Sequence, residues 1–198
     1  MSKLLFQGHG SFRLTSNDGR VIYIDPYAGE GYDLPADIIL VTHQHFDHNK
    51  TELCTQKSDC RVITNKEALA GGKHNSFDIG GVLIQAVQAK NFLHSVKQCV
   101  GYIITIDGVK IYASGDTSKT KQMETFADLK LDYAILTGDG FFTMGLKKSA
   151  ECARIIGAKN NIIIHTDLRP SALFSRKKAE KWNAPNKIIV EPGQEIAL

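Results

Sequence analysis

Three histidines and an aspartate lie within six residues of this chain, at His43, His45, Asp47 and His48. Imidazole and carboxylate are ordinary ligands of zinc and similar divalent ions. In an extended backbone alternate side chains share a face, so His43 and His45 should point the same way. A helix beginning just after them would bring Asp47 and His48 round on its first turn. One short loop can then serve two adjacent metal ions.

A purification tag, a structural zinc site or surface histidines gathered by chance could also produce such a cluster. The internal position of the cluster excludes a tag, and a structural zinc site usually contains cysteine, which the cluster lacks. We therefore interpret the cluster as a catalytic metal centre and keep chance clustering as the alternative.

A centre with two ions needs further ligands from distant parts of the chain. Three candidates stand beside predicted strands, as the cluster itself does after the apolar run 38–40. His94 precedes the strand predicted at 102–106, Asp116 follows the strand at 109–113, and His165 ends the strand at 162–164. Each residue alone would be unremarkable, but together with the cluster they complete a donor set for two ions.

The composition is that of an ordinary globular protein. Of 198 residues, 42% are hydrophobic and 23% are charged, which argues against disorder and predicts one domain over residues 1–198. The net charge of +3 is spread along the chain, so we expect no nucleic-acid partner. The four cysteines lack Cys-x-x-Cys spacing, and no apolar run reaches membrane-spanning length. These features predict reduced thiols, a cytoplasmic location and no membrane insertion.

The order of the predicted elements indicates two packed sheets. Short strands dominate the first part, with turn signals at 17–19 and 107–108, and strands alternate with helices later. We expect helices at 65–70, 119–129, 149–156 and 177–182, and a last substantial strand at 187–190. This pattern favours an α/β (α+β) fold with two mixed sheets and helices outside.

Several motifs together resemble the metallo-β-lactamase fold superfamily, specifically its small hydrolase branch rather than its antibiotic-degrading enzymes. His43-x-His45-x-Asp47-His48 is similar to the signature of the superfamily, and the segment 114–117 resembles the one that holds its metal-bridging aspartate. Similar segments lie at 8–12, 24–27, 142–144 and 191–193. The resemblance spans nearly the whole chain and implies a four-layer αββα sandwich.

The resemblance also implies roles for individual residues. His43, His45 and His94 would hold one metal ion, Asp47, His48 and His165 would hold the other, and Asp116 would bridge them. Asp25 would orient a ligand histidine. His9 is similar to a histidine near the substrate mouth of this branch, and the alternative is a buried, hydrogen-bonded histidine without a functional role. The ions would be two divalent metals, with zinc expected and manganese, nickel or iron as alternatives.

Two segments depart from the pattern of the branch. Where it commonly reads Leu-Pro-Ile-Gly-Gly, this chain has Gly138-Asp139-Gly140 after Leu136-Thr137, which adds a carboxylate. The residues after His165 also differ from the tyrosine often found there. Both segments adjoin the expected substrate pocket, for which the candidate lining residues are Phe46, Asn91, Asp139, Phe141 and Arg169.

The implied function is hydrolysis of an ester, lactone, amide or phosphodiester bond in a small molecule by a bridging hydroxide. Asp47 and Asp116 would be the catalytic carboxylates, with Asp47 relaying a proton to the leaving group. The alternatives are a small phosphodiesterase acting on a nucleotide or lipid-like substrate, and a non-catalytic metal or ligand sensor of the same fold. The sequence leaves the substrate and the oligomeric state open.

Overall fold

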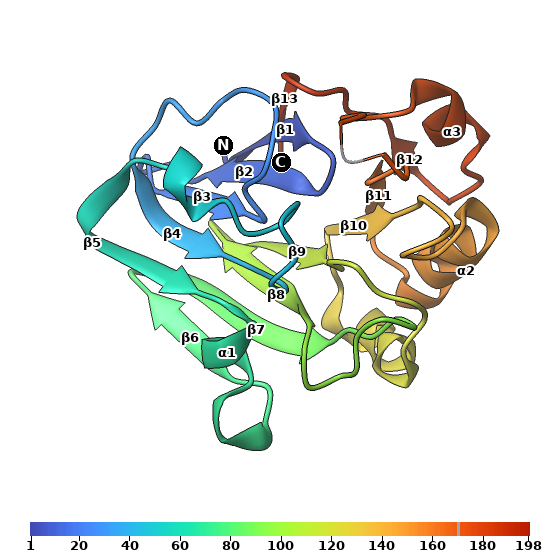
Figure 1. Ribbon diagram of the computed structural model, residues 1–198, viewed down its shortest axis with the longest axis horizontal. Coiled ribbons are helices and arrows are strands. Elements are labelled where there is room, and N and C mark those ends of the chain that lie inside the picture. The colour runs from blue at the N-terminus through green and yellow to red at the C-terminus, as the bar shows by residue number, and fades with distance from the viewer. Residues whose placement is uncertain (170) are drawn as a thin grey trace.

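The computed structural model describes residues 1–169 and 171–198, and its strands form two sheets (Figure 1). The first sheet contains strands from both ends of the chain. Its antiparallel half pairs β13, β1, β2 and β3, and its parallel half continues from β3 to β4 and β5. In sheet order the strands are β13 (Glu195–Ala197), β1 (Lys3–Gly8), β2 (Ser11–Thr15), β3 (Val21–Ile24), β4 (Ala36–Leu40) and β5 (Gln56–Ile63).

The second sheet repeats this division. Strands β6 to β9 are antiparallel neighbours, and β9, β10, β11 and β12 are parallel. In sheet order the strands are β12 (Lys187–Ile188), β11 (Asn160–Ile164), β10 (Tyr133–Thr137), β9 (Val109–Ala113), β8 (Val100–Ile106), β7 (Val82–Gln88) and β6 (Ser76–Ile79).

The main core lies between the two sheets because alternate residues of their strands are apolar. In β7, for example, Val82, Ile84 and Ala86 are buried while Leu83 and Gln85 are exposed. Such inward-facing side chains form one cluster with contributions from both sheets. The predicted sandwich of two mixed sheets is therefore confirmed.

The outer layers of the sandwich differ in thickness. The second sheet is covered by α2 (Leu146–Ile156), α3 (Arg176–Lys181) and the 3-10 helix η3 (Lys121–Leu129), whose apolar side chains form a second core. The described residues over the first sheet are a loop carrying Tyr32 and Leu34, together with the short 3-10 helix η1 (Thr51–Leu53). Near the end of β5 lie α1 (Asn65–Ala68) and the 3-10 helix η2 (Ala70–Gly72).

Some predicted elements differ from those observed. Asp47 and His48 lie in a turn instead of a helix, because the His48 N–H bonds the His45 carbonyl at 3.1 Å and the chain then leaves the site. The helix predicted at 119–129 is the 3-10 helix η3, which begins only at Lys121, and the strand at 187–190 shortens to two residues. The sequence interpretation missed β6 and β13. Among the described residues, no helix is long and apolar enough to cross a membrane.

Candidate metal centre

The residues of the candidate site follow the parallel strands of both sheets. Asp25 comes directly after β3, and the histidine cluster begins after β4. In the second sheet Asp116 follows β9, Asp139 follows β10 and His165 follows β11. Because parallel strands end at the same edge of a sheet, this topology gathers polar side chains that are far apart in sequence.

The first donor set consists of His43, His45 and His94, each offering a ring nitrogen within 4.8 Å of the others. The Nε2 atoms of His45 and His94 lie 3.0 Å apart, and the ring centres of His43 and His45 are separated by 4.7 Å. His43 is buried, whereas His45 and His94 are partly exposed. The converging nitrogens suit one metal ion at the mouth of the site.

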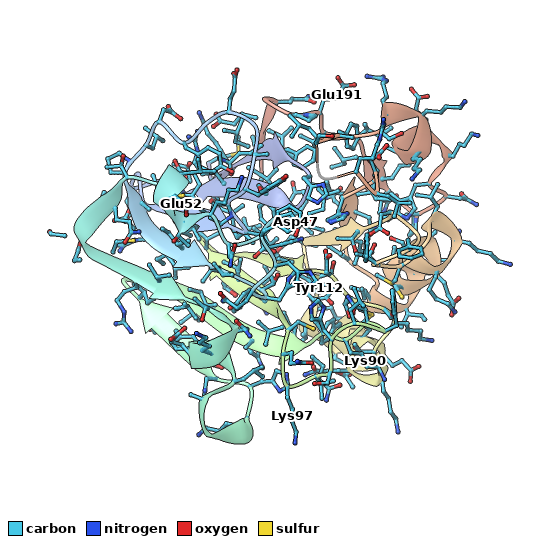
Figure 2. All side chains as sticks on the ribbon, viewed as in Figure 1. Asp47, Glu52, Lys90, Lys97, Tyr112 and Glu191 are labelled. Carbon is cyan, nitrogen blue, oxygen red and sulfur yellow. The ribbon has the colours of Figure 1, made fainter. Side chains whose placement is uncertain are left out.

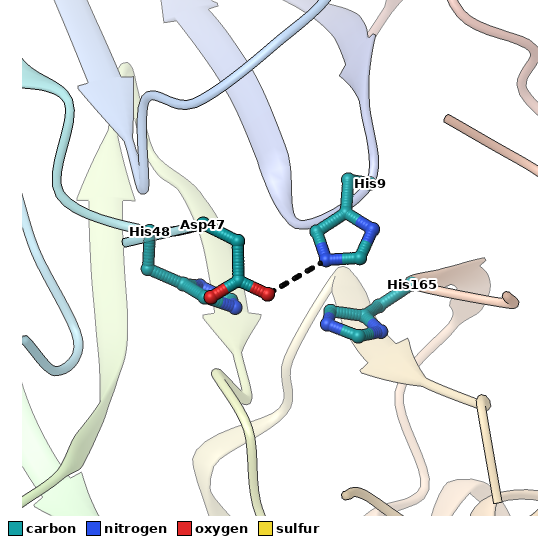
Figure 3. A group of neighbouring side chains, drawn as sticks. All are labelled: His9, Asp47, His48 and His165. Atoms are coloured by element: carbon teal, nitrogen blue, oxygen red, sulfur yellow. Dashed lines mark hydrogen bonds and ion pairs between the residues drawn. The ribbon is translucent and has the colours of Figure 1, made fainter. Parts of the chain in front are cut away.

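The second donor set consists of Asp47, His48 and His165, joined by His9, again with donor atoms within 4.8 Å of one another. Figure 3 shows the carboxylate of Asp47 pointing toward His9, whose Nε2 lies 3.2 Å from Asp47 Oδ2. The rings of His9 and His165 are 3.8 Å apart between centres. Asp47 lies toward the middle of the molecule in Figure 2, while Lys97 and Glu191 lie at its periphery.

Asp116 stands between the two donor sets. Its Oδ1 lies 3.5 Å from His48 Nε2, and its Oδ2 lies 3.6 Å from His165 Nε2. With His43 and His48 it also forms a buried group whose donor atoms lie within 4.8 Å. A carboxylate in this position lies within reach of donors from both sets.

Asp25 supports His48 from behind. One carboxylate oxygen accepts the backbone N–H of Thr42 at 2.7 Å, and the other accepts the Thr42 hydroxyl at 2.7 Å. The second oxygen also lies 2.9 Å from His48 Nδ1, which leaves His48 Nε2 directed at Asp116. Such a carboxylate fixes the ring orientation and the proton position of a ligand histidine. The structure thus places Asp25 beside His48, the contact that the resemblance implied with a candidate ligand histidine.

Asp139 stands behind His165 as Asp25 stands behind His48, but it makes no hydrogen bond to the ring. Its Oδ2 lies 3.4 Å from His165 Nδ1, an ion-pair distance, while His165 Nε2 faces Asp116. Both of its oxygens also bind the following loop, since Oδ1 accepts the N–H groups of Phe141 and Phe142 and Oδ2 accepts that of Thr143 at 3.1 Å. The carboxylate added in this segment therefore joins the second donor set to the loop 140–145.

Asn91 joins the His94 loop to the Asp116 loop. Its Oδ1 accepts the backbone N–H of His94 at 2.8 Å, and its Nδ2 donates to the Asp116 carbonyl at 3.2 Å. Asn91 was expected at the substrate pocket, and the structure shows that its side chain is occupied by these loop contacts. It positions the loop of His94 relative to the loop of Asp116.

His9 is buried and hydrogen-bonded, as the alternative interpretation of this residue expected. It lies in the turn between β1 and β2 and is only 1% exposed, so it contacts the second donor set instead of standing at the mouth. Its backbone has a φ of 54°, a left-handed conformation that is uncommon for a residue with a side chain. The next residue must be Gly10, because a Cβ there would lie 2.7 Å from the ring of His48.

The donor atoms themselves fit a metal site. Buried atoms without a hydrogen-bond partner among the described residues include His43 Nε2, His48 Nε2, Asp116 Oδ1 and both ring nitrogens of His165. Buried polar groups are normally paired, and leaving one unpaired costs about 1–3 kcal/mol. A metal ion satisfies such atoms together, and imidazole with carboxylate is the donor chemistry of zinc and its neighbours.

The charges of the two donor sets differ. Burial lowers the pKa of His43 and that of His94. Burial also lowers the pKa of an isolated His48, but the carboxylates of Asp116 and Asp25 outweigh burial and raise it well above the usual value. Against the effect of burial, the hydrogen bond from His9 and the charge of His48 lower the pKa of Asp47 to about 2. Without a metal, these carboxylates thus favour a proton on His48, whereas burial lowers the pKa of His165 as it does in the first set.

A cavity of about 420 Å³ opens over the donor sets. It is lined by His45, Asp47, Asp116 and His165 and by three apolar side chains, Phe46, Phe142 and Leu168. Of the predicted lining residues, Phe46 is present, Asp139 is buried behind His165, and Phe141 lies farther out. Arg169 is exposed and bonds Asp167. The sequence interpretation missed Phe142 and Leu168, although each lies three residues from a site residue.

A family model described as a β-lactamase superfamily domain matches residues 3–165, well over half of the chain. The chain belongs to this superfamily. A metal-dependent hydrolase from Methanoculleus marisnigri is 31% identical, with 99% of this chain and 96% of that one covered. The superfamily membership expected from the motifs is thereby confirmed.

Solved structures support the same fold. The metallo hydrolase Igni18 from Ignicoccus hospitalis is 19% identical and aligns with a TM-score of 0.78, over 98% of this chain and 97% of that one. A protein from Parabacteroides distasonis, described as a candidate metal-dependent hydrolase, is 29% identical and aligns with a TM-score of 0.74, over 98% of this chain and 94% of that one. The two sheets of this superfamily member are thus in the metallo-β-lactamase arrangement.

Proposed function

We propose that this protein is a metal-dependent hydrolase with a binuclear centre, acting on a small molecule in the cytoplasm. The observation that carries the proposal is the place of Asp116 between two donor sets. The Nε2 atoms of His43, His48 and His165 are buried and have no hydrogen-bond partner among the described residues. The relatives named metal-dependent hydrolases support the reaction class.

The residues fit two divalent ions, for which zinc is our first choice and manganese, nickel and iron are alternatives. His43, His45 and His94 would hold one ion, Asp47, His48 and His165 would hold the other, and Asp116 would contribute to both. When bound, such ions supply Lewis acidity and make water a nucleophile at neutral pH.

The protein's own residues would orient the substrate and handle a proton. The carboxylate of Asp47 is ionised at neutral pH and reaches the cavity, so it can take a proton from the attacking water. In ester hydrolysis the oxygen of that water joins the carbonyl carbon and the ester C–O bond breaks. Asp47 would then pass the proton to the departing alcohol oxygen. His9 holds Asp47 in place through Oδ2.

The first test is the metal content of untagged protein after reconstitution with zinc or manganese. We expect two ions per chain, and one ion in His48→Ala. The matched control is His74→Ala, since His74 is a histidine outside both donor sets. No ion after reconstitution would point to a degenerate or sensor-like member of the fold. Two ions without turnover of any ester, lactone, amide or phosphodiester would contradict the hydrolase.

A further inference from the structure

Large apolar side chains are exposed around the mouth of the candidate centre. The described residues leave eight such side chains strongly exposed, and five of them belong to loops that carry site residues. We call these five the apolar rim, and they are Phe46 (62% exposed), Phe92 (68%), Leu93 (46%), Phe141 (59%) and Leu168 (41%). Single exposed apolar residues are common on proteins, but a group around one opening marks a binding site.

The sequence positions of the rim tie it to the metal donors. Phe46 stands between His45 and Asp47, and Leu93 directly precedes His94. The aromatic rings also touch one another, since Phe92 packs edge-on against Phe141 at 5.8 Å between ring centres and Phe141 packs against Phe142 at 4.8 Å. The rim is therefore built on the same loops that the donor sets fix.

The rim continues into the cavity over the donors. Phe46 and Leu168 belong to both the rim and the cavity lining. Phe142 contacts Phe141 of the rim and lines the cavity together with His165 and Asp116. The volume of about 420 Å³ falls within the range of small-molecule sites. Among the described residues that line it there is no lysine or arginine, the side chains that proteins use to bind phosphate.

From these observations we infer that the apolar rim binds the acyl or aryl part of an uncharged carbonyl substrate, an ester, lactone or amide, and presents its carbonyl to the donor sets. This inference rests on the proposed hydrolase. It selects among the bonds considered above, because a nucleotide or another phosphodiester would bring a charged group to a wall of phenylalanine and leucine. A membrane or a second copy of the chain could also cover a flat apolar face, but neither would fill a cavity whose floor carries the donors.

The inference is tested first by binding, without turnover. Alkyl hydroxamates bind metal through the hydroxamate head and leave the chain free for the rim. We would titrate acetohydroxamate, butyrohydroxamate and octanohydroxamate into the zinc-loaded protein by calorimetry. Each fully buried methylene contributes about fourfold in affinity, so partial burial of the longer chain predicts at least about a tenfold gain from butyro- to octanohydroxamate.

Two rim variants locate the effect. Phe92→Ser and Phe141→Ser change side chains that are mostly exposed, so both should fold, and each should reduce the gain with chain length while leaving acetohydroxamate binding unchanged. The control is Leu83→Ser, because Leu83 is 50% exposed on β7 and lines a different cavity beside Phe77 and Ile103. The same chain-length gain should appear in kcat/KM for p-nitrophenyl acetate, butyrate and octanoate.

Equal affinity for the three hydroxamates, or an equal loss in Leu83→Ser, would overturn the inference while the hydrolase proposal stood. Preferred turnover of bis(p-nitrophenyl) phosphate over every ester would also overturn it. The inference would also be overturned if the protein sedimented with phosphatidylcholine vesicles, or formed a dimer, and if Phe92→Ser and Phe141→Ser abolished that association. If hydroxamate affinity rises with chain length but no ester is hydrolysed, the pocket stands and the proposed reaction fails.

Discussion

The two donor sets sit side by side but are supported differently. In the first set, His45 and His94 are partly exposed, and His43 Nδ1 lies 3.0 Å from the hydroxyl of Thr42. In the second set, both histidines are almost fully buried and each has a carboxylate behind it, Asp25 for His48 and Asp139 for His165. Outer carboxylates fix ligand orientation and raise ligand basicity. The comparison teaches that affinity here should depend on the residues behind the ligands.

The largest effect should come from Asp116, which stands between the two sets. Asp116→Ala should lower turnover by roughly a thousandfold or more, because it removes a carboxylate from each half of the centre at once. Steady-state rates and metal content would be measured together, with circular dichroism to verify folding. Asp128→Ala, a change at an exposed aspartate on η3, is the matched control. Unchanged activity in a folded Asp116→Ala protein would rule out the bridging role.

The comparison itself is tested by separating the sets. His94→Ala weakens the first set and His165→Ala the second, so each variant should retain one tightly held zinc ion. At pH 8 the ion kept in His94→Ala should bind roughly ten- to a hundredfold more tightly than the ion kept in His165→Ala, since its histidine ligands have outer carboxylates. Competition with a chromophoric chelator measures both affinities. Equal affinities would show that burial and outer carboxylates do not distinguish the halves.

Asp139→Asn should sharpen this result. Both oxygens of Asp139 act as acceptors, since Oδ1 accepts the N–H groups of Phe141 and Phe142 and Oδ2 accepts that of Thr143. Oδ2 also faces His165 Nδ1, and asparagine has only one acceptor oxygen. In the His94→Ala background we expect zinc affinity to fall about 10- to 100-fold. Asp167→Asn is the control, since Asp167 bonds the exposed Arg169 instead. An unchanged zinc affinity would show that Asp139 only binds the N–H groups of the loop 140–145 and does not support His165 as a ligand.

Much of the centre could be predicted because its signals are local. Four donors lie within six residues, and His165 directly follows a run of three isoleucines that forms β11. The turn at 46–48 was mistaken for a helix start because spacing alone does not distinguish a first helical turn from an isolated one. The turn contains one hydrogen bond, from the His48 N–H to the His45 carbonyl, and no further helical turn follows it.

The support of the site was harder to foresee. His9 reaches the second donor set through a left-handed backbone, and the glycines on either side of it were the available signal. Phe92 and Leu168 lie in irregular loops, where no periodicity indicates which way a side chain faces. Their contacts depend on the relative placement of loops that are far apart in the sequence, a long-range property.

The smallest predicted difference between the donor sets is their response to pH. The carboxylates of Asp116 and Asp25 raise the pKa of His48, so without metal the second set holds a proton that an incoming ion must displace. Raising the pH removes this competitor, and zinc affinity there should rise by up to about tenfold per pH unit until the pKa of His48 is passed.

In the first set, burial lowers the pKa values of His43 and His94, so these rings are already neutral above about pH 6.5 and proton competition from them should be slight. Chelator competition between about pH 6.5 and 8 in His94→Ala and His165→Ala measures the two slopes. Asp25→Asn should flatten the steeper slope, because it removes one of the charges that hold the proton on His48. Parallel slopes in both variants would mean that the two sets do not differ in the protons they hold, and the asymmetry would then rest on ligand orientation alone.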